Sequence, residues 1–295
     1  MHVIESRREL QLRADAERAA GQRLALVPTM GAIHAGHLSL VAEGRKRADQ
    51  VWVSIFVNPT QFNEPNDFEG YPRELERDLA QCREAGVDLV YVPRVEDVYP
   101  EGAQTWVDVQ EITKPLCGAS RPGHFRGVTT VVSKLFLAAK PHVAVFGQKD
   151  FQQLAVIRRM VRDLGFDVDV VGAPIVREPD GLALSSRNQL LGPEARQNAV
   201  GLVRALDIAE AAVASGERQS APLLERVRAE IDGVPRSCVD YAELRDPETL
   251  ELAPEALSAP TLLALAVVFE PDEDGQGTSV RLIDNRLLLD AGGPE

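Results

Sequence analysis

Cysteines and long hydrophobic runs are scarce in this sequence. Its 295 residues include three cysteines, Cys82, Cys117 and Cys238, which lie far apart and form no CxxC pair. This usage favours a reducing compartment, with thiols that are structural or incidental. No stretch of about 18 consecutive apolar residues occurs, and the N-terminus is charged, which argues against a membrane span and a secretory signal. The sequence therefore predicts a cytoplasmic protein.

An excess of positive charge is also missing. The formal net charge is −13, which argues against nucleic acid and anionic membrane as partners. Residues 1–190 carry 23 basic and 25 acidic side chains, whereas residues 191–295 carry 9 and 20. An anionic substrate is therefore expected to bind the first part of the chain, where local lysines and arginines can override the overall sign.

Hydrophobic periodicity predicts an α/β fold. With 44% hydrophobic and 26% charged residues, the composition is that of an ordinary globular protein. Strand-like and helix-like segments alternate up to residue 171, which predicts a Rossmann-like parallel sheet with helices on both faces. The expected strands are 24–27, 51–57, 87–92, 142–146 and 166–171, and the expected helices are 5–20, 38–48, 73–85, 127–139 and 150–164.

The pattern changes after Pro174. A loop at 178–187 is followed by helical patterns and then by short strand-like runs, which predicts a smaller α+β domain. We expect one long helix at 194–214, a shorter one at 223–231, and antiparallel pairing among strands at 238–244, 262–268 and 280–283. The predicted domains are 1–175 and 176–295. No internal repeat, low-complexity tract or P-loop is found.

A glycine-rich turn with two histidines lies near the N-terminus, in the sequence Val27-Pro-Thr-Met-Gly-Ala-Ile-His-Ala-Gly-His-Leu38. A buried strand is expected before it and a helix after it. Gly31 and Gly36 let the backbone approach a ligand closely, and a helix N-terminus favours an anion. His34 and His37 can each donate a hydrogen bond to a phosphate oxygen or carry a positive charge. The turn is a candidate phosphate site.

Two other interpretations of the histidine pair are available. The rings could bind zinc, but no third Cys, His or carboxylate follows at a metal-site spacing, and the glutamate of a zincin is missing. They could also cap the helix and have no further role. The residues alone leave that second interpretation open.

The turn resembles the HxGH signature of the nucleotidylyltransferase superfamily, and Pro28-Thr-Met-Gly31 narrows the resemblance to the pantothenate synthetase family. That family joins pantoate to β-alanine with ATP. The resemblance runs through the chain in order, with further motifs at 58–62, 121–127, 147–153, 178–188, 245–250 and 281–285. It implies that Met30, Gly31, His34 and His37 bind ATP and that both histidines are catalytic.

The motif Phe146-Gly-Gln-Lys-Asp-Phe-Gln-Gln153 also joins a strand to a helix. A lysine at the positive end of a helix is repelled unless an anion separates them, so Lys149 suggests a phosphate ligand, although it could be a solvated surface lysine. The resemblance implies that Gly147, Lys149 and Asp150 contact ATP, that Lys149 is catalytic, and that Gln153 contacts pantoate.

The motif Asn58-Pro-Thr-Gln-Phe62 follows the second expected strand. Gln61 offers a donor and an acceptor to a substrate with hydroxyls beside a carboxylate, but Asn-Pro could simply end the strand. By resemblance Gln61 binds pantoate, although the family commonly has Met where this chain has Thr60. The resemblance also carries over Arg121, and His124, as residues bordering the site.

The segment Leu184-Ser-Ser-Arg187 ends a loop that is expected to be mobile. Two hydroxyls and a guanidinium suit phosphate oxygens, but an ordinary serine cap beside a surface arginine is the simpler alternative. By resemblance to the superfamily's KMSKS-type loop, ATP binds Leu184, Ser185, Ser186 and Arg187 together with Val176, and Arg187 is catalytic. The second domain is then expected to act as a lid.

The family chemistry proceeds through a pantoyl adenylate, with magnesium bound to the nucleotide and no dedicated metal site on the protein. Asp78 could suggest a magnesium ligand, but its charged helical surroundings predict a solvated face. The alternatives are a related nucleotidylyltransferase acting on a small acid or phosphate, or a nucleotide-binding module without catalysis. A homodimer is implied by the resemblance alone.

One stretch departs from the family pattern. The family usually passes directly from an apolar strand into Arg281-Leu-Ile-Asp-Asn285, whereas this chain has Glu270-Pro-Asp-Glu-Asp-Gly-Gln-Gly277 before it. Acidic residues and glycines between two strands predict a solvated hairpin loop, so deleting 272–276 is expected to leave folding and activity nearly intact.

Overall fold

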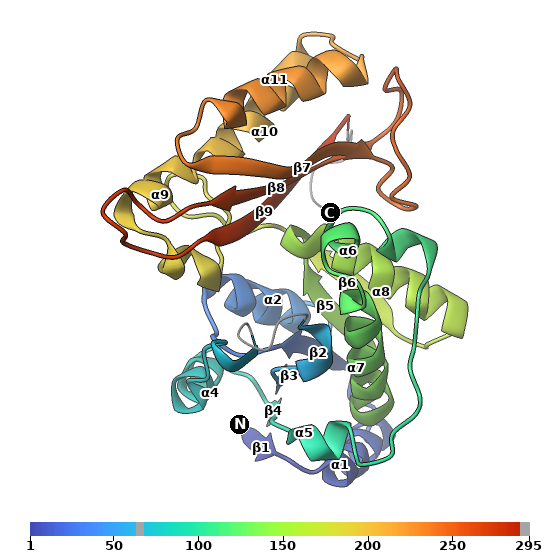
Figure 1. Cartoon of the computed structure of the whole chain (residues 1–295). Helices are drawn as coiled ribbons and strands as arrows, with labels where there is room; N and C mark the ends of the chain where they lie inside the picture. The colour runs from blue at the N-terminus through green and yellow to red at the C-terminus, as the bar shows by residue number, and fades with distance from the viewer. Residues whose placement is uncertain (63–67, 290–295) are drawn as a thin grey trace. The chain divides into compact units, whose positions relative to one another are not determined.

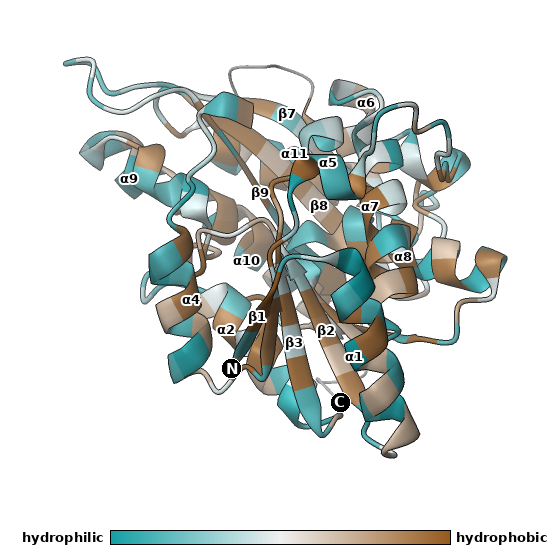
Figure 2. Cartoon of the chain, turned by 90° about the horizontal axis from the view of Figure 1, so that it is seen from below, coloured by the Kyte–Doolittle hydropathy of each residue, from teal (hydrophilic) through white to brown (hydrophobic). Residues whose placement is uncertain are grey.

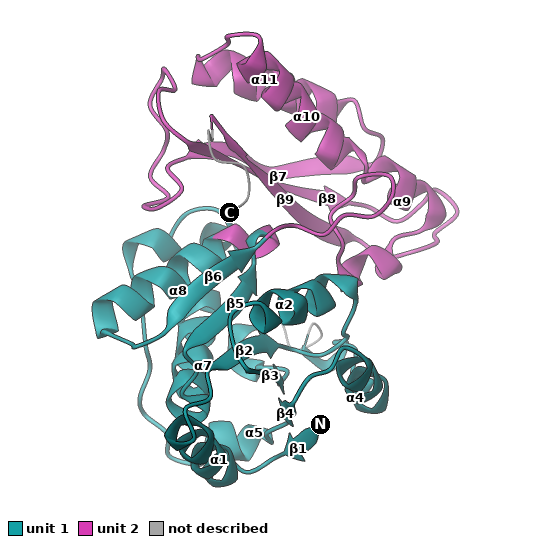
Figure 3. Cartoon of the chain, turned by 180° about the vertical axis from the view of Figure 1, so that it is seen from behind, with its two compact units in different colours: residues 1–148, 152–173 teal, residues 149–151, 174–295 magenta. Residues whose placement is uncertain are grey.

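A computed structural model describes residues 1–62 and 68–289 of the chain. It divides into two compact units (Figures 1 and 3). The first comprises residues 1–148 and 152–173, and the second comprises residues 149–151 and 174–295. Within the described ranges, no helix is long and apolar enough to cross a membrane.

The first unit contains a six-stranded sheet in which every strand pair is parallel. The predicted α/β class is therefore confirmed. The strand order is β1-β4-β3-β2-β5-β6, so the sheet grows in opposite directions from β2, with β3 on one side and β5 on the other. The strands are β1 (His2–Ile4), β2 (Leu24–Thr29), β3 (Gln50–Ile55), β4 (Leu89–Tyr91), β5 (Val143–Gly147) and β6 (Asp169–Ala173). The short edge strand β1 was not among the predicted strands.

Alternate residues of each strand enter two separate cores. Leu24 and Leu26 of β2 belong to one cluster, which also contains apolar residues of α1, α7 and α8. Ala25 and Val27 belong to the other, with α2 and α4. This alternation is why both faces of the strands are mostly apolar, and brown is prominent along them in Figure 2. The helices are α1 (Arg7–Ala19), α2 (Ala35–Arg45), α4 (Leu75–Glu84), α5 (Val95–Val98), α6 (Cys117–Ser120), α7 (His124–Ala139) and α8 (Phe151–Leu164).

The second unit has an antiparallel sheet in the order β7-β8-β9, as the sequence predicted. Its strands are β7 (Ser237–Arg245), β8 (Thr261–Phe269) and β9 (Val280–Leu288). Their apolar residues form one core with those of α9 (Pro193–Asn198), α10 (Gly201–Ala214) and α11 (Ser220–Asp232). The small α+β architecture was thus predicted correctly, although β9 extends beyond residue 283.

The prediction of one long helix at 194–214 was wrong, because α9 and α10 are separate. At the junction Val200 N donates to Gln197 O (3.3 Å) and Leu202 N donates to Ala199 O (3.1 Å). These i→i−3 bonds tighten the backbone into a turn where an uninterrupted α-helix would keep i→i−4 bonds. Both helices bury apolar residues in the same core, so the hydrophobic period continues across the break and hides it.

The solvated-loop prediction for the acidic stretch was also wrong in part. Residues 273–279 are exposed, but Asp272 is only 7% exposed. Its carboxylate accepts hydrogen bonds from Glu194 N and Ala195 N at the start of α9. Composition indicated a loop correctly and could not reveal that one of its acidic side chains is covered.

Candidate active site

The histidine turn, residues 28–38, leaves the carboxyl end of β2, next to the point where the strand order reverses. Open parallel sheets bind ligands at such a point. Thr29 Oγ1 donates to Ser54 O (2.8 Å) and accepts from Gly31 N (3.2 Å), which turns the chain sharply away from the strand. Gly31 has φ +87°, and a Cβ there would lie 2.8 Å from Asp78 Oδ2. Glycine is therefore required for both conformation and space.

Asp78 of α4 fixes this turn, which corrects the prediction that it lies on a solvated helix face. The residue is 2% exposed. Its Oδ2 accepts from Ala32 N (2.9 Å) and its Oδ1 accepts from Ile33 N (2.7 Å). Burial, and secondarily the charge of Asp78, raises the pKa of the nearby Cys82 thiol to about 11. The polar pattern of α4 concealed Asp78, because its partners come from another part of the chain.

The two histidines cap α2 reciprocally. His34 is the N-cap, and its Nδ1 accepts from Gly36 N (3.1 Å), while His37 Nδ1 accepts from His34 N (3.3 Å). The capping interpretation is thus correct, and the capping bonds also determine which ring nitrogen carries the proton. An Nδ1 that accepts a hydrogen bond carries no proton, so the neutral ring has its proton on Nε2. Both rings, whose centroids are 4.1 Å apart, are fixed as Nε2–H donors.

A second group of predicted residues surrounds the 3₁₀ turn η1 (Pro59–Gln61). Gln61 is 8% exposed, and its Nε2 donates to Met30 Sδ (3.0 Å). Arg121 Nη2 donates to Gln61 O (3.1 Å), and His124 Nδ1 lies 2.8 Å from the same oxygen. The structure therefore brings Met30, Gln61, Arg121 and His124 together, although these residues are far apart in the sequence.

Asn58 organises the same turn and was not predicted as a site residue. Its Nδ2 donates to Gln61 Oε1 (3.1 Å) and to Gly127 O (3.1 Å), so the Gln61 amide is held in one orientation. Asn58 Oδ1 accepts from Tyr99 OH (2.9 Å) and from Thr60 Oγ1 (3.0 Å). Burial is the main cause that raises the pKa of Tyr99 above its ordinary value. Thr60, where the family pattern has Met, is thus absorbed into a hydrogen-bonded network.

The two adjacent glutamines at the start of α8 differ in their surroundings. Gln152 is 6% exposed and donates to Ile112 O (3.1 Å) and Pro115 O (2.7 Å), so its role is structural. Gln153, the predicted pantoate ligand, is half-buried in the same helical turn. Gly147 ends β5, and the turn η3 (Gln148–Asp150) connects it to α8.

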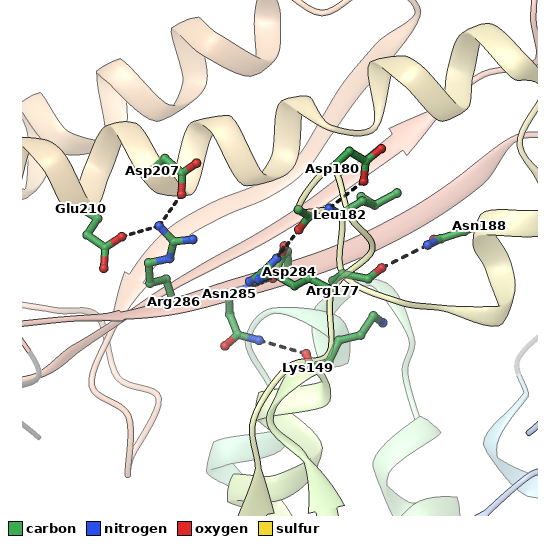
Figure 4. Close-up of polar contacts among 12 residues, drawn as sticks. Lys149, Arg177, Asp180, Leu182, Asn188, Asp207, Glu210, Asp284, Asn285 and Arg286 are labelled. Carbon is green, nitrogen blue, oxygen red and sulfur yellow. Dashed lines mark hydrogen bonds and ion pairs between the residues drawn. The ribbon is translucent and has the colours of Figure 1, made fainter. Parts of the chain in front are cut away.

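The predicted phosphate residues of the second unit follow a loop that is hydrogen-bonded at its base. Leu184 N donates to Val176 O (2.9 Å), which closes the segment into a narrow turn. Arg177 forms two bonds to Asp284 of β9, at 2.7 and 3.0 Å, and the Asp284 side chain is fully buried (Figure 4). A paired, bidentate geometry is what makes a buried carboxylate tolerable.

Strand β9 also forms a hydrogen bond to Lys149, which belongs to the second unit. Asn285 Nδ2 donates to Lys149 O (3.0 Å), so the 281–285 motif fixes both the backbone of this lysine and Arg177 (Figure 4). Further along, Ser185 is the N-cap of η4 (Ser186–Leu190) and accepts from Arg187 N (3.3 Å). The serine-cap interpretation is therefore correct for Ser185, while the Arg187 side chain is exposed.

Comparison with known proteins identifies the family. The profile described as Pantoate-beta-alanine ligase matches residues 2–287. The chain belongs to this family. It is 56% identical to pantothenate synthetase of Geobacter sulfurreducens, over 98% of this chain and 99% of that protein. It is 53% identical to the enzyme of Syntrophobacter fumaroxidans, over 99% and 100% of the two chains. The resemblance inferred from the sequence motifs is thus confirmed.

Solved structures of the family have the same fold. Pantothenate synthetase from Thermus thermophilus matches with a TM-score of 0.87 and 45% identity, covering 97% of this chain and 99% of that chain. A pantoate-beta-alanine ligase from Francisella tularensis, described as complexed with beta-gamma ATP and beta-alanine, matches with a TM-score of 0.75 and 31% identity. It covers 97% of each chain. Both units of the pantoate-beta-alanine ligase fold are therefore present.

Proposed function

We propose that this chain condenses pantoate with β-alanine at the expense of ATP, through a pantoyl adenylate, releasing AMP and pyrophosphate. The observation that carries the proposal is the match to the ligase family over residues 2–287. ATP and β-alanine appear in the description of a related ligase of known structure. The fixed Nε2–H donors of His34 and His37 fit this chemistry, because anionic phosphate needs donors.

In the first step a pantoate carboxylate oxygen attacks the α-phosphorus of ATP, and the bond from that phosphorus to the pyrophosphate oxygen breaks. His34, His37 and Lys149 donate to oxygens on which negative charge grows. Preorganised donors stabilise such a transition state more than the ground state. Met30, Gly31, Gly147 and Asp150 complete the nucleotide contacts that we propose for this part of the chain.

A second set of proposed ATP ligands comes from the loop of the second unit: Val176, Leu184, Ser185, Ser186 and Arg187. Two hydroxyls and a guanidinium match phosphate oxygens, and Arg187 can bind two of them at once. The role of this unit as a lid remains part of the proposal.

Gln61, Gln153 and Arg121 are the proposed pantoate ligands. Gln61 is suited to the task because Asn58 and Met30 already hold its amide in one orientation. In the second step the β-alanine amine attacks the acyl carbon, loses a proton, and the bond to the AMP oxygen breaks. No protein side chain forms a covalent bond, so catalysis rests on positioning and electrostatics.

Magnesium would neutralise the phosphates of the bound nucleotide. Across residues 1–62 and 68–289 no group of three His, Cys, Asp or Glu side chains converges. Both oxygens of Asp78 accept from backbone N–H groups. We propose that ATP carries this cation. A homodimer and a cytoplasmic location complete the proposal.

Isotope exchange tests the adenylate route. With ATP, magnesium and pantoate, and without β-alanine, the protein should exchange labelled pyrophosphate into ATP. A nucleotide-binding module would exchange nothing, and a nucleotidylyltransferase with another substrate would not depend on pantoate. Exchange that required β-alanine would point to a different order of bond formation, and the adenylate would have to be abandoned. Stoichiometric AMP and amide product would complete the assignment.

A further inference from the structure

The connection between β8 and β9, residues 270–279, has one buried carboxylate among exposed residues. Asp272 is 7% exposed, and its Oδ2 accepts from Glu194 N (3.0 Å) while its Oδ1 accepts from Ala195 N (2.8 Å). These N–H groups lie in the first turn of α9, where a helix has no internal acceptors. A carboxylate from a distant part of the chain therefore satisfies two successive donors of this helix.

The backbone of the same connection is joined to the end of η4. Thr278 N donates to Leu190 O (3.0 Å), and Leu191 forms an antiparallel bridge with Gly277. The two stretches of backbone touch here: a Cβ on Gly277 would lie 2.2 Å from Gly192 N. The contact is close and built from glycines, so it is more than a chance approach of an exposed loop.

Helix α9 is also bonded to the loop that precedes η4. Arg196 of α9 pairs with Glu178 at 2.6 Å and with Asp180 at 2.8 Å. Glu178 in turn accepts from Asn188 Nδ2 at 2.6 Å. The segment 185–188 is therefore enclosed by two attachments, one through Glu178 and one through the 270–279 connection.

We infer that the 270–279 connection is a brace that holds Ser185–Arg187 in the conformation that binds ATP, with Asp272 as its positioning residue. The inference rests on the proposed ATP-binding role of those three residues. Without the carboxylate, two donors at the start of α9 lose their acceptor, and the segment attached to that helix gains other conformations. Apparent affinity falls in proportion to the fraction that remains competent.

Steady-state kinetics of Asp272→Ala test the brace. The KM for ATP should rise about tenfold if about one tenth of the molecules stay competent, while kcat at saturating ATP changes little because ATP selects the competent form. The KM for pantoate should stay unchanged. Asp272→Asn, which keeps one acceptor oxygen, should lie between Asp272→Ala and the unmodified chain. Glu273→Ala removes the adjacent, exposed carboxylate and should match the unmodified chain.

Hydrogen exchange gives a readout that does not depend on activity. In Asp272→Ala without ligand, peptides covering 185–195 should exchange faster than in the unmodified chain, and peptides from β7 should not. Unchanged exchange at 185–195, or faster exchange with an unchanged KM for ATP, would overturn the brace. If the unmodified chain makes no pantothenate, the proposed function fails instead, and the exchange pattern still decides whether Asp272 orders the segment. If Asp272→Ala does not fold, Asp272→Asn carries both measurements.

Discussion

The histidine turn of the first unit and the 185–195 segment of the second are held by the same device. In each, a buried carboxylate from a distant part of the chain accepts from two successive backbone N–H groups. Asp78 does so from a helix at 2% exposure, and Asp272 does so from a loop at 7% exposure. Neither carboxylate is a ligand in the proposed mechanism, yet each positions a segment that carries proposed ligands.

The two carboxylates differ in what they stabilise. Asp78 bonds a turn in which Gly31 and Ala32 both have positive φ, at +87° and +50°. An alanine with positive φ is strained and persists only when its surroundings impose it. Asp272 bonds the start of an ordinary helix, where no residue has a positive φ. Asp78 therefore creates a conformation, because the strained turn persists only when its surroundings impose it. Asp272 selects one conformation of a segment that has others, so losing Asp272 should lower the unfolding free energy less.

Asp78→Ala should have the largest effect. It leaves one buried and one partly buried N–H group without an acceptor, at about 1–3 kcal/mol each, so unfolding free energy should fall by about 4 kcal/mol. Urea unfolding followed by circular dichroism measures this. Asp78→Asn, which retains one acceptor, should lose about half as much. Equal stability of Asp78→Ala and the unmodified chain would show that the turn does not depend on this carboxylate.

His37→Ala should come next, and its effect should fall on catalysis. Losing one preorganised donor costs about 2.7–4 kcal/mol, so kcat should fall by about 10²–10³ with a much smaller change in ATP binding. Asn can replace Nδ1 as an acceptor and Gln can replace Nε2 as a donor. Accordingly, His37→Gln should keep more kcat than His37→Asn, while His37→Asn should keep the melting temperature better. An unchanged kcat in His37→Ala would remove this residue from the mechanism.

Asp272→Ala should destabilise the protein less than Asp78→Ala does. A lost helix cap costs about 0.5–2 kcal/mol, and only α9 and its contacts are affected. The same urea titration gives the value, and Glu273→Ala should differ from the unmodified chain by less than about 0.5 kcal/mol. A loss as large as that of Asp78→Ala would contradict the distinction between creating and selecting a conformation.

The pH dependence near Asp78 should show the smallest effect. Folding raises the pKa of the Cys82 thiol from its ordinary value of 9.0 to about 11. The neutral thiol therefore stabilises the fold fully below pH 9, and that contribution is lost as the pH rises toward 11. Between about pH 8 and about pH 10 the unmodified chain should lose about 1 kcal/mol more unfolding free energy than Cys82→Ala. If the unfolding free energy changed with pH equally in both proteins, folding would not raise the pKa of this thiol.

Much of the site could be predicted because its residues are local in sequence. The turn at 28–38 contains its own strand end, glycines and histidines, and the resemblance supplied roles for Gln61 and Lys149 from short motifs. Asp78 and Asn58 were missed as positioning residues because each has partners in other segments. A polar residue in a charged helix gives no signal that another segment covers it.

Sequence by itself determined the alternation of strands and helices, the α/β and α+β character of the two units, and the family. These follow from period, turn residues and motifs, which are properties of neighbouring residues. The tertiary structure alone decided that His34 and His37 present Nε2–H, that one predicted helix is two, and that Asp78 and Asp272 are buried acceptors. Each of these depends on which distant backbone groups need a partner, and hydrogen-bond satisfaction is settled only when the chain is packed.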